Sequence, residues 1–536
     1  MQADMMKYPL TLVPILERAG KLFGRVEIVS RCPDKSLHRY TYADFYRRAR
    51  ALAEALQRAG LRPGDRVATL MWNHHAHLEA YFGIPVAGGV VHTLNLRLHA
   101  GDLAYIVNHA QDRFLIVDDV LLPLYEKFKD QVGVERVMVV PLSGQTPPYE
   151  SYESFLVGAS GQFSYPELDE EQAAGLCFTS GTTGRPKGVL YSHRALAVHT
   201  LACALSGTMG IAQQDVMLAV VPMFHANAWG WPYLGALVGA KQALPGPHLD
   251  AESLLDLFQS EQVTAVAGVP TIMLGILQAL EKEPGRWKLT PGMRMVVGGA
   301  AAPEAMIRRF DQLGIRVVHA WGMTEMTPMG TVCELKSYME DWPEEARYEV
   351  RAKQGLPAPF VEIRAVNERG EVPWDATTQG ELQVRGPWIA ARYYKLPEEQ
   401  NRWTQDGWFR TGDVATIDPE GYVKIVDRTK DLIKSGGEWI SSVELETTLM
   451  GHPEVREAAV IAVPHPKWGE RPLAVVVRKD GTRVAAEELR EFLTPRVAKW
   501  WLPDAFVFVE EIPRTSAGKF MKSRLREQFR DWKWEA

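Results

Sequence analysis

The chain has 536 residues, of which 46% are hydrophobic, and its 60 Lys and Arg against 66 Asp and Glu give a formal net charge of −6. A single hydrophobic core stops growing at about 250–300 residues, so this length predicts at least two domains. The slightly acidic balance, with no dense run of Lys and Arg, argues against nucleic acid as a partner.

The N-terminus and the cysteines bear on location. The apolar patch in residues 1–24 is interrupted by Glu17 and Arg18, so it is too short for a signal peptide or a membrane span. The four cysteines stand far apart and include no C-x-x-C pair, which argues against a zinc site and a disulfide framework. We therefore expect a cytoplasmic protein without a transmembrane segment.

Short apolar runs bounded by Gly, Pro or Asp predict buried strands in the first 330 residues. They lie at 66–72, 113–119, 136–140, 216–222, 263–270 and 294–300. Amphipathic stretches at 42–60 and 251–262 have apolar residues at i, i+3 and i+4, which predicts helices between the strands. This alternation indicates α/β layers with mostly parallel sheet. The run HHAH (74–77) has no second cluster of ligands, so core histidines are favoured over a metal site.

The pattern changes after about residue 355. Closely spaced strands with turn signals, at 361–373 and 380–388, predict a smaller β-rich subdomain that ends near residue 427. The charged segment DRTKDLIKSGGEW (427–439) follows, and a new α/β pattern begins at 441. We place the start of a small C-terminal domain in this segment.

The stretch TSGTTGRPKG (179–188) has the composition of a phosphate-binding loop. Its glycines let backbone N–H groups converge on an anion, and Ser180, Thr182 and Thr183 add hydroxyl donors. It is not a Walker motif, because a proline precedes Lys187 and a glycine follows it. From these residues alone, a polar surface loop is an equally good interpretation.

The loop resembles the phosphate-loop signature of the adenylate-forming superfamily, which includes acyl-CoA synthetases, peptide-synthetase adenylation domains and beetle luciferases. Further segments match in the family's order: VPMFHANAW (221–229), HAWGMTE (319–325), WFRTGD (408–413), DRTKDLIKSGGEW (427–439) and PRTSAGKF (513–520). The whole-chain resemblance is closest to bacterial medium- and long-chain fatty-acid:CoA ligases. It implies an enzyme that joins a fatty acid to coenzyme A through an acyl-AMP intermediate and releases AMP and pyrophosphate from ATP.

The resemblance also implies the nucleotide site. Its residues are Thr179, Ser180, Gly181, Thr182, Thr183, Gly184, Lys187, Gly299, Ala300, His319, Ala320, Trp321, Gly322, Met323, Thr324, Asp413 and Arg428. Trp321 would stack on adenine, and Asp413 would accept from the ribose hydroxyls. Thr179 and Glu325 would hold Mg²⁺, which prefers oxygen ligands.

Catalytic roles implied by the resemblance fall on Lys519, Glu325 and Lys434. Lys519 would supply positive charge during adenylation and would then be withdrawn when the C-terminal domain rotates about a hinge at Lys430. The implied organisation is an N-terminal AMP-binding adenylation domain at 1–427, a hinge at 428–433 and a mobile α+β domain at 434–536. In the second orientation Lys434 would face the acyl-adenylate, together with the loop residues Gly436, Gly437, Glu438 and Trp439.

The segment 221–240 is free of charged residues and rich in aromatic and small ones, which predicts an apolar pocket for an alkyl chain. The resemblance places the acyl site at His225, Ala226, Trp229 and Trp231, with Trp229 gating the tunnel. Ala226 is smaller than the residue usual at its position and would widen the mouth, whereas Trp231 is larger and would narrow it.

Other functions remain open at this stage. The same chemistry on a short acid such as 3-methylthiopropionate is the main alternative, and acyl transfer to a carrier protein is another, although no carrier domain is attached. A nucleotide-binding module without catalysis would be expected to lack Lys519 or Glu325, and both are present. A homodimer is the assembly we would test first.

Overall fold

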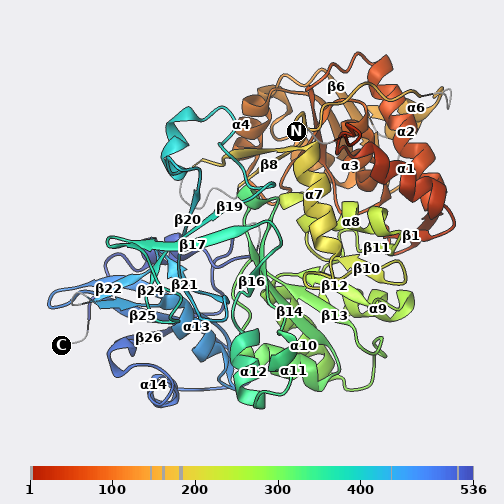
Figure 1. Ribbon diagram of the computed structural model, residues 1–536. Coiled ribbons are helices and arrows are strands. Elements are labelled where there is room, and N and C mark those ends of the chain that lie inside the picture. The colour runs from red at the N-terminus through yellow and green to blue at the C-terminus, as the bar shows by residue number, and fades with distance from the viewer. Residues whose placement is uncertain are drawn as a thin grey trace.

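The computed structural model describes residues 4–144, 148–159, 163–179, 185–435, 438–515 and 518–534. Two mostly parallel sheets with helices around them form the large N-terminal part, and a smaller sheet lies beside both this part and the C-terminal domain (Figure 1). The predicted α/β architecture is therefore confirmed. Over the residues it describes, the structure has no helix with the length and apolar character needed to cross a membrane.

The first large sheet has seven strands. In spatial order they are β7 (Glu150–Ser151), β6 (Arg136–Val140), β5 (Asp112–Asp118), β3 (Arg66–Leu70), β4 (Val90–Thr93), β8 (Ala173–Phe178) and β9 (Gly188–Ser192). Neighbouring strands from β7 to β8 pair parallel, and β8 and β9 form an antiparallel hairpin. Helices of this part are α1 (Val13–Leu22), α2 (Tyr42–Arg58), α3 (His75–Val86), α4 (Ala100–Ala110), α5 (Leu122–Tyr125), α6 (Tyr152–Leu156) and α7 (His193–Ala204).

The second large sheet has nine strands. Their order is β16 (Leu356–Pro357), β15 (Met329–Val332), β14 (Arg316–Gly322), β13 (Arg294–Val297), β12 (Ala265–Gly268), β10 (Val216–Ala219), β11 (Lys241–Leu244), β1 (Glu27–Arg31) and β2 (Leu37–Thr41). Pairing is parallel from β14 to β1. Its helices are α8 (Trp231–Val238), α9 (Ala251–Glu261), α10 (Pro270–Lys282), α11 (Glu304–Gln312) and α12 (Glu344–Arg351). The carboxyl ends of β13 and β14 lead into VGGAAAP and WGMTE, where ligands of α/β sheets usually bind.

The predicted β-rich subdomain is an antiparallel sheet of five strands. It contains β18 (Gly370–Glu371), β17 (Glu362–Asn367), β19 (Gly380–Arg385), β20 (Phe409–Ile417) and β21 (Val423–Arg428), in this order. Its last two strands carry Asp413 and Arg428 in direct register. The subdomain therefore ends at the start of the expected hinge.

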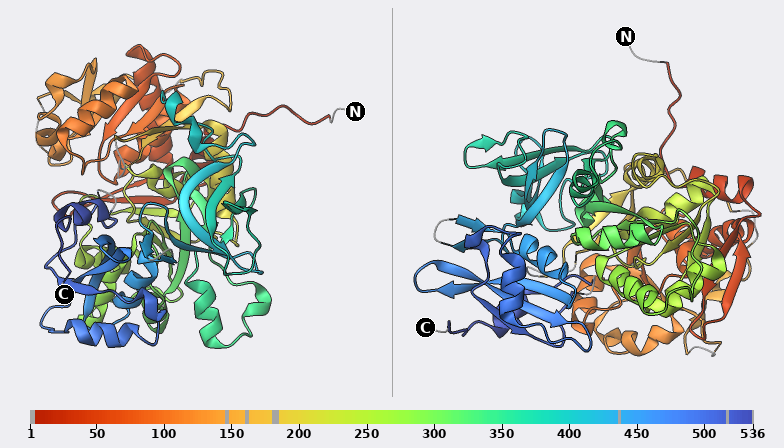
Figure 2. Two further views of the ribbon diagram at one scale, coloured as in Figure 1. Left: turned by 90° about the vertical axis from the view of Figure 1, so that its left-hand side faces the viewer. Right: turned by 90° about the horizontal axis from the view of Figure 1, so that it is seen from below.

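The C-terminal domain has a sheet of its own. Its strands are β22 (Ile433–Ser435), β23 (Glu438–Ile440), β24 (Val455–His465), β25 (Gly469–Arg478) and β26 (Ala505–Phe508), and its helices are α13 (Ser442–Met450), α14 (Ala486–Leu493) and α15 (Lys522–Gln528). In two views this domain lies against the β-rich subdomain and the second large sheet, while the chain's first described residues extend away from the body (Figure 2).

Helix α2 illustrates how sequence pattern fixes an element in the core. Thr41 and Asp44 form a capping box at its start, in which the Thr41 N–H donates to Asp44 Oδ2 at 3.1 Å. Phe45, Leu52 and Leu56, spaced by whole turns, are completely buried. Each such side chain contributes about 1.5–3 kcal/mol when removed from water.

The histidine run 74–77 is absorbed into the core at the start of α3. His74 Nε2 lies 2.8 Å from Asp118 Oδ1, and His77 Nε2 lies 3.0 Å from Thr69 Oγ1. Among the described residues, no three His, Cys, Asp or Glu side chains are grouped as a metal site would require. These rings therefore have ordinary structural partners.

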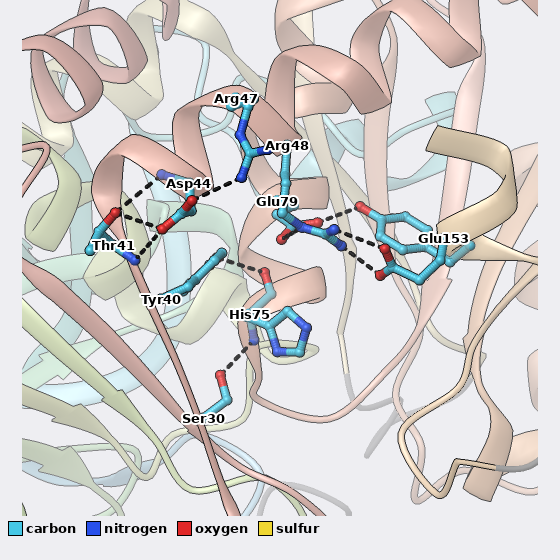
Figure 3. Close-up of polar contacts among 10 residues, drawn as sticks. Ser30, Tyr40, Thr41, Asp44, Arg47, Arg48, His75, Glu79 and Glu153 are labelled. Carbon is cyan, nitrogen blue, oxygen red and sulfur yellow. Dashed lines mark hydrogen bonds and ion pairs between the residues drawn. The ribbon is translucent and has the colours of Figure 1, made fainter. Parts of the chain in front are cut away.

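One turn further along α3, Glu79 is part of a buried charge network (Figure 3). Arg48 Nε donates to Glu79 Oε1 at 2.7 Å, and the same guanidinium binds both oxygens of Glu153 at 2.8 and 2.7 Å. Tyr152 donates to the other oxygen of Glu79 at 2.9 Å. Because Glu79 is completely buried, this pairing compensates the cost of removing its carboxyl from water.

Candidate functional site

A cavity of about 580 Å³ lies where the N-terminal part, the β-rich subdomain and the C-terminal domain meet. Most of the expected site residues line it: Thr179, Lys187, His225, Ala226, Trp229, Gly299, Ala300, His319, Ala320, Trp321, Gly322, Met323, Thr324, Glu325, Asp413, Arg428, Lys430 and Lys519. Residues that are more than 300 positions apart in sequence therefore contribute to one space.

Some expected residues are not in this cavity or are not described. Ser180, Gly181, Thr182, Thr183, Gly184, Gly436 and Gly437, with the side chain of Glu438, lie outside the described residues. Trp231 is buried in the hydrophobic core and does not line the cavity, so it does not narrow its mouth. Lys434 and the exposed Trp439 also lie away from the cavity, with the Lys434 ammonium 5.4 Å from the Trp439 ring centroid.

The glycine-rich loop connects the two strands of the β8–β9 hairpin. The two ends of the loop are tied together. Thr179 N–H donates to Lys187 O at 2.9 Å, and Lys187 N–H donates to Thr179 Oγ1 at 3.1 Å. The Lys187 ammonium lies 2.6 Å from Glu399 Oε1. This geometry fixes where both side chains stand beside the cavity.

Two glycines follow β13 at positions that a side chain would not fit. A Cβ added at Gly298 would stand 2.8 Å from Ala320 O, and Gly299 has a φ of +83°, which side-chain-bearing residues rarely adopt. His319, on the adjacent strand β14, supports this turn by accepting from Ala302 N–H at 3.3 Å. Burial lowers the pKa of His319 to about 4, so the ring is neutral and structural at pH 7.

Asp413 joins an aromatic ring to a cation. Its Oδ2 accepts from Trp321 Nε1 at 2.9 Å, and its Oδ1 lies 2.9 Å from Arg428 Nε. Asp413 is 3% exposed, and its charge is the main cause that raises the pKa of Arg428. The arrangement offers a flat apolar face beside paired carboxylate and guanidinium groups, which suits a nucleoside.

Glu325 presents a carboxylate to the same cavity. It is 4% exposed, and its Oε1 accepts from the Tyr393 hydroxyl at 2.5 Å. Burial, with Glu325 nearby, raises the pKa of Tyr393, so the phenol remains a donor. Tyr393 was missed from the sequence because its segment, ARYYKLPEE, carries no motif that we recognised.

Lys519 enters the cavity from the C-terminal domain. Its backbone N–H donates to Thr515 Oγ1 at 3.1 Å, and its Cε stands 3.8 Å from the position of a Cβ on Gly299. The turn docks on the start of α10, where Arg514 Nη1 donates to Thr271 Oγ1 at 3.1 Å. Burial, reinforced by Arg428, lowers the pKa of Lys519 to about 8. A desolvated ammonium thus stands beside the glycine turn.

Trp229 is presented by a left-handed turn that the sequence did not predict. Residues 226–230 all have positive φ, from 43° at Ala226 to 80° at Gly230. Left-handed geometry costs roughly 1–2 kcal/mol per non-glycine residue, so the surroundings must hold it. Cys177 Sγ donates to Asn227 Oδ1 at 3.0 Å, behind the turn. The Trp229 ring lies against Gly298 and Gly299, next to Lys519.

The remaining lining is of two kinds. Met209, Pro328 and Met329 add apolar surface to that of Trp229 and Ala226. Charged lining residues that were not identified from sequence are Asp427, Asp431, Glu446 and Lys522. Asp427 and Asp431 lie in the matched segment 427–439, whose charge density was the only signal for them.

Comparisons with known proteins agree with this architecture. The AMP-binding enzyme family matches residues 16–394, and the AMP-binding enzyme C-terminal domain matches residues 444–519. A long-chain-fatty-acid–CoA ligase of Thermus thermophilus is 51% identical, covering 99% of this chain and 97% of its own. A 3-methylmercaptopropionyl-CoA ligase of Ruegeria lacuscaerulensis is 44% identical, covering 99% of both chains.

A solved structure is similar over the whole chain. The anthranilate CoA ligase AuaEII, crystallised with anthranoyl-AMP, has a TM-score of 0.87 at 25% identity, covering 98% of this chain and 99% of its own. The two matched family domains correspond to the large N-terminal and small C-terminal parts that meet at the cavity. The chain therefore belongs to the AMP-binding enzyme family and is an AMP-forming acyl-CoA synthetase of the adenylate-forming superfamily.

Proposed function

We propose that the enzyme activates a medium- to long-chain fatty acid with ATP and transfers the acyl group to coenzyme A. The observation that carries this proposal is that one cavity is lined both by the bonded group of Trp321, Asp413 and Arg428 and by the apolar side chains of Trp229 and Met209. Lys519 is buried in the same cavity. A carboxylate with an alkyl tail and a nucleotide can therefore meet at the lysine.

In the first half-reaction, the fatty-acid carboxylate attacks the α-phosphate of ATP and pyrophosphate leaves. Negative charge builds on the α-phosphate, and the Lys519 ammonium stabilises it more strongly in a buried site than it would in water. Trp321 stacks on the adenine, while Asp413 accepts from the ribose hydroxyls and Arg428 reinforces it. Lys187 and the loop 179–188 hold the outer phosphates.

Thr179 and Glu325 are our proposed ligands for Mg²⁺. Both line the cavity, and the donor set of hydroxyl and carboxylate oxygens suits this ion. Glu325 is buried with its Oε1 oriented by Tyr393, which is how ligating carboxylates are commonly held. When bound, the ion would neutralise charge on the ATP phosphates.

In the second half-reaction, the thiol of coenzyme A attacks the acyl carbonyl and AMP leaves. We propose that the domain 434–536 rotates about the hinge 428–433 between the two steps, relative to the domain 1–427. Lys434, Gly436, Gly437, Glu438 and Trp439 would then replace Lys519 at the acyl-adenylate.

Contacts on either side of the hinge support a pivot at Lys430. Thr429 N–H donates to Gly412 O at 2.9 Å, which attaches the preceding residue to the β-rich subdomain. Asp431 forms an ion pair with Arg526 of α15, which attaches the following residue to the C-terminal domain. Lys430 is the residue between these two attachments.

The short-acid alternative rests on two relatives, since the Ruegeria lacuscaerulensis enzyme and a second one from Ruegeria pomeroyi are both named for 3-methylmercaptopropionate. Acyl transfer to a carrier protein has no comparable support. A homodimer stays a prediction, for which the exposed Met5, Met6 and Tyr8 on the N-terminal arm offer an apolar surface. A cytoplasmic location also stays a prediction.

The test is kcat/KM for pyrophosphate release across straight-chain acids of four to sixteen carbons. Each buried CH₂ contributes about 0.8 kcal/mol, so we expect kcat/KM to rise with chain length to a plateau. Replacing Trp229 with Ala should shift or remove the plateau, because the ring lines the cavity beside the glycine turn. A sharp preference for the shortest acids would contradict the proposal and favour the alternative.

A further inference from the structure

We propose that Asp427 and Lys522 are positioning residues for adenylation, acting through a latch that holds the C-terminal domain where Lys519 reaches the cavity. We define the hinge latch as Asp427, Ser442, Glu446 and Lys522. The inference rests on the proposed function, because it assigns these residues to one of the two half-reactions.

The latch begins at the last strand before the hinge. Asp427, near the end of β21, is 1% exposed, and its Oδ2 accepts from the N–H of Ser442 at 2.7 Å. The Ser442 hydroxyl donates to the same oxygen. Ser442 is the first residue of α13, so a carboxylate from the β-rich subdomain lies at the N-terminus of a helix of the C-terminal domain.

Lys522 completes the latch from α15. Its Nζ lies 2.6 Å from Ser442 Oγ and 2.6 Å from Glu446 Oε1. Its side chain is only 10% exposed, and that of Glu446 is 8% exposed. The ammonium therefore pairs directly with Glu446, which follows the proposed hinge, and is linked through the Ser442 hydroxyl to Asp427, which precedes it.

The latch is specific to one orientation of the domains. Ser442, Glu446 and Lys522 all follow the hinge and would move together when the C-terminal domain rotates. Asp427 precedes the hinge and would stay with β21. Rotation would therefore separate Asp427 from the other three members of the latch. The contacts of Asp427 within the β-rich subdomain would be kept. A contact present in only one of two states shifts the population toward that state.

Sequence proximity couples the latch to catalysis. Lys522 follows Lys519 by three residues, and the intervening Phe520 also lines the cavity. The segment that carries the catalytic lysine is thus anchored at one end by the latch and at the other by Arg514 on Thr271. Loss of the latch should withdraw Lys519 from the cavity without altering the groups expected to act on coenzyme A.

The experiment measures single-turnover rates of both half-reactions in the full-length enzyme. Adenylation is followed with ATP and the best fatty acid of the wild type, and thioesterification is followed from preformed acyl-AMP and coenzyme A. We expect Lys522→Met and Asp427→Asn each to slow adenylation about tenfold and to leave thioesterification unchanged or faster. Both substitutions disrupt the same latch, so their effects should not add. Adenylation by the double variant should therefore be at most about twofold slower than by either single variant.

Matched variants separate positioning from stability. Lys522→Arg keeps the charge and should retain most of the adenylation rate. Asp504→Asn weakens another ion pair, Arg471 Nε to Asp504 Oδ2 at 2.7 Å, that lies wholly within the C-terminal domain, and it should leave the ratio of the two rates as in the wild type. If Lys522→Met does not fold, Ser442→Ala removes the hydroxyl link and should change the ratio in the same direction.

Equal loss in both half-reactions, or an unchanged ratio in the folded latch variants, would overturn the inference. Failure of the wild type to form acyl-AMP from any acid would instead overturn the proposed function, so the two failures are distinguishable.

Discussion

Two buried charge networks in this molecule use the same chemistry in different settings. In the first, Arg48, Glu79 and Glu153 come from helices α2, α3 and α6, which share the core of the N-terminal part. In the second, the hinge latch joins β21 to α13 and α15 across the proposed hinge. Buried polar contacts stabilise a fold when their partners belong to one rigid body, as Arg48 and Glu79 do, and they stabilise an orientation when, like Asp427 and Ser442, the partners belong to two.

The difference predicts which variants affect folding and which affect turnover. Disrupting the first network should lower the free energy of unfolding and leave the ratio of the two half-reactions unchanged. Changes at the hinge and at the cavity should alter one half-reaction more than the other. Each prediction below tests one side of this comparison.

Arg48→Met should have the largest effect on stability. It leaves the completely buried Glu79 without its cation, which typically costs about 3–5 kcal/mol. The measurement is denaturant or thermal unfolding, together with both half-reactions at a temperature where the variant is folded. Arg47→Met is the matched control on the same helix, because its pair with Asp44 is exposed and worth about 0–1 kcal/mol at most. If Arg48→Met unfolds at the same temperature and denaturant concentration as the wild type, the Arg48–Glu79 pair does not stabilise the fold.

The pH dependence of adenylation should report Lys519. Burial lowers its pKa to about 8, so the charged form dominates below this pH and is lost as the pH rises through it. We therefore expect kcat/KM for pyrophosphate release to fall about tenfold per pH unit above about 8. Lys519→Arg should remove this fall up to pH 10, because the guanidinium stays protonated. A profile that rises across this range would contradict the proposed role of the ammonium.

Lys430→Pro should have a smaller, selective effect. Proline fixes φ and restricts the backbone at the proposed pivot, so thioesterification should slow by several-fold more than adenylation. Lys430→Ala keeps backbone freedom and serves as the control, with both rates near those of the wild type. Single-turnover kinetics of each half-reaction make the measurement. If Lys430→Pro forms the thioester at the wild-type rate, Lys430 is not the pivot of the domain rotation.

The sequence predicted the layers because the apolar runs and amphipathic periods match the elements closely. The run at 136–140 is β6, and the stretch at 251–262 contains α9. The motif resemblance assigned Trp321, Asp413 and Lys519 to one site, and all three line one cavity although they are far apart in the chain. The sequence pattern predicted the elements, and the resemblance predicted which of their residues meet. The spacing of the motifs along the chain does not by itself give distances in space.

The rest could not be predicted because it depends on tertiary surroundings. The turn at 226–230 is left-handed, with the Asn227 side chain accepting from Cys177 behind it, and no local sequence pattern predicts such a backbone. The expectation that Trp231 narrows the mouth of the acyl site was wrong, because its side chain is buried in the core and does not line the cavity. The latch was missed because Lys522 in isolation reads as a solvated lysine, and only the fold places it beside Ser442 and Glu446.

The central claim is that Lys519 serves adenylation alone and is withdrawn before the thioester forms. The most direct test is Lys519→Ala, with both half-reactions measured in single turnover. We predict that adenylation falls by about 10²–10³-fold, as expected when a preorganised group worth roughly 3–4 kcal/mol is removed. Conversion of preformed acyl-AMP to acyl-CoA should stay near the wild-type rate. Equal loss in the two half-reactions would contradict the account.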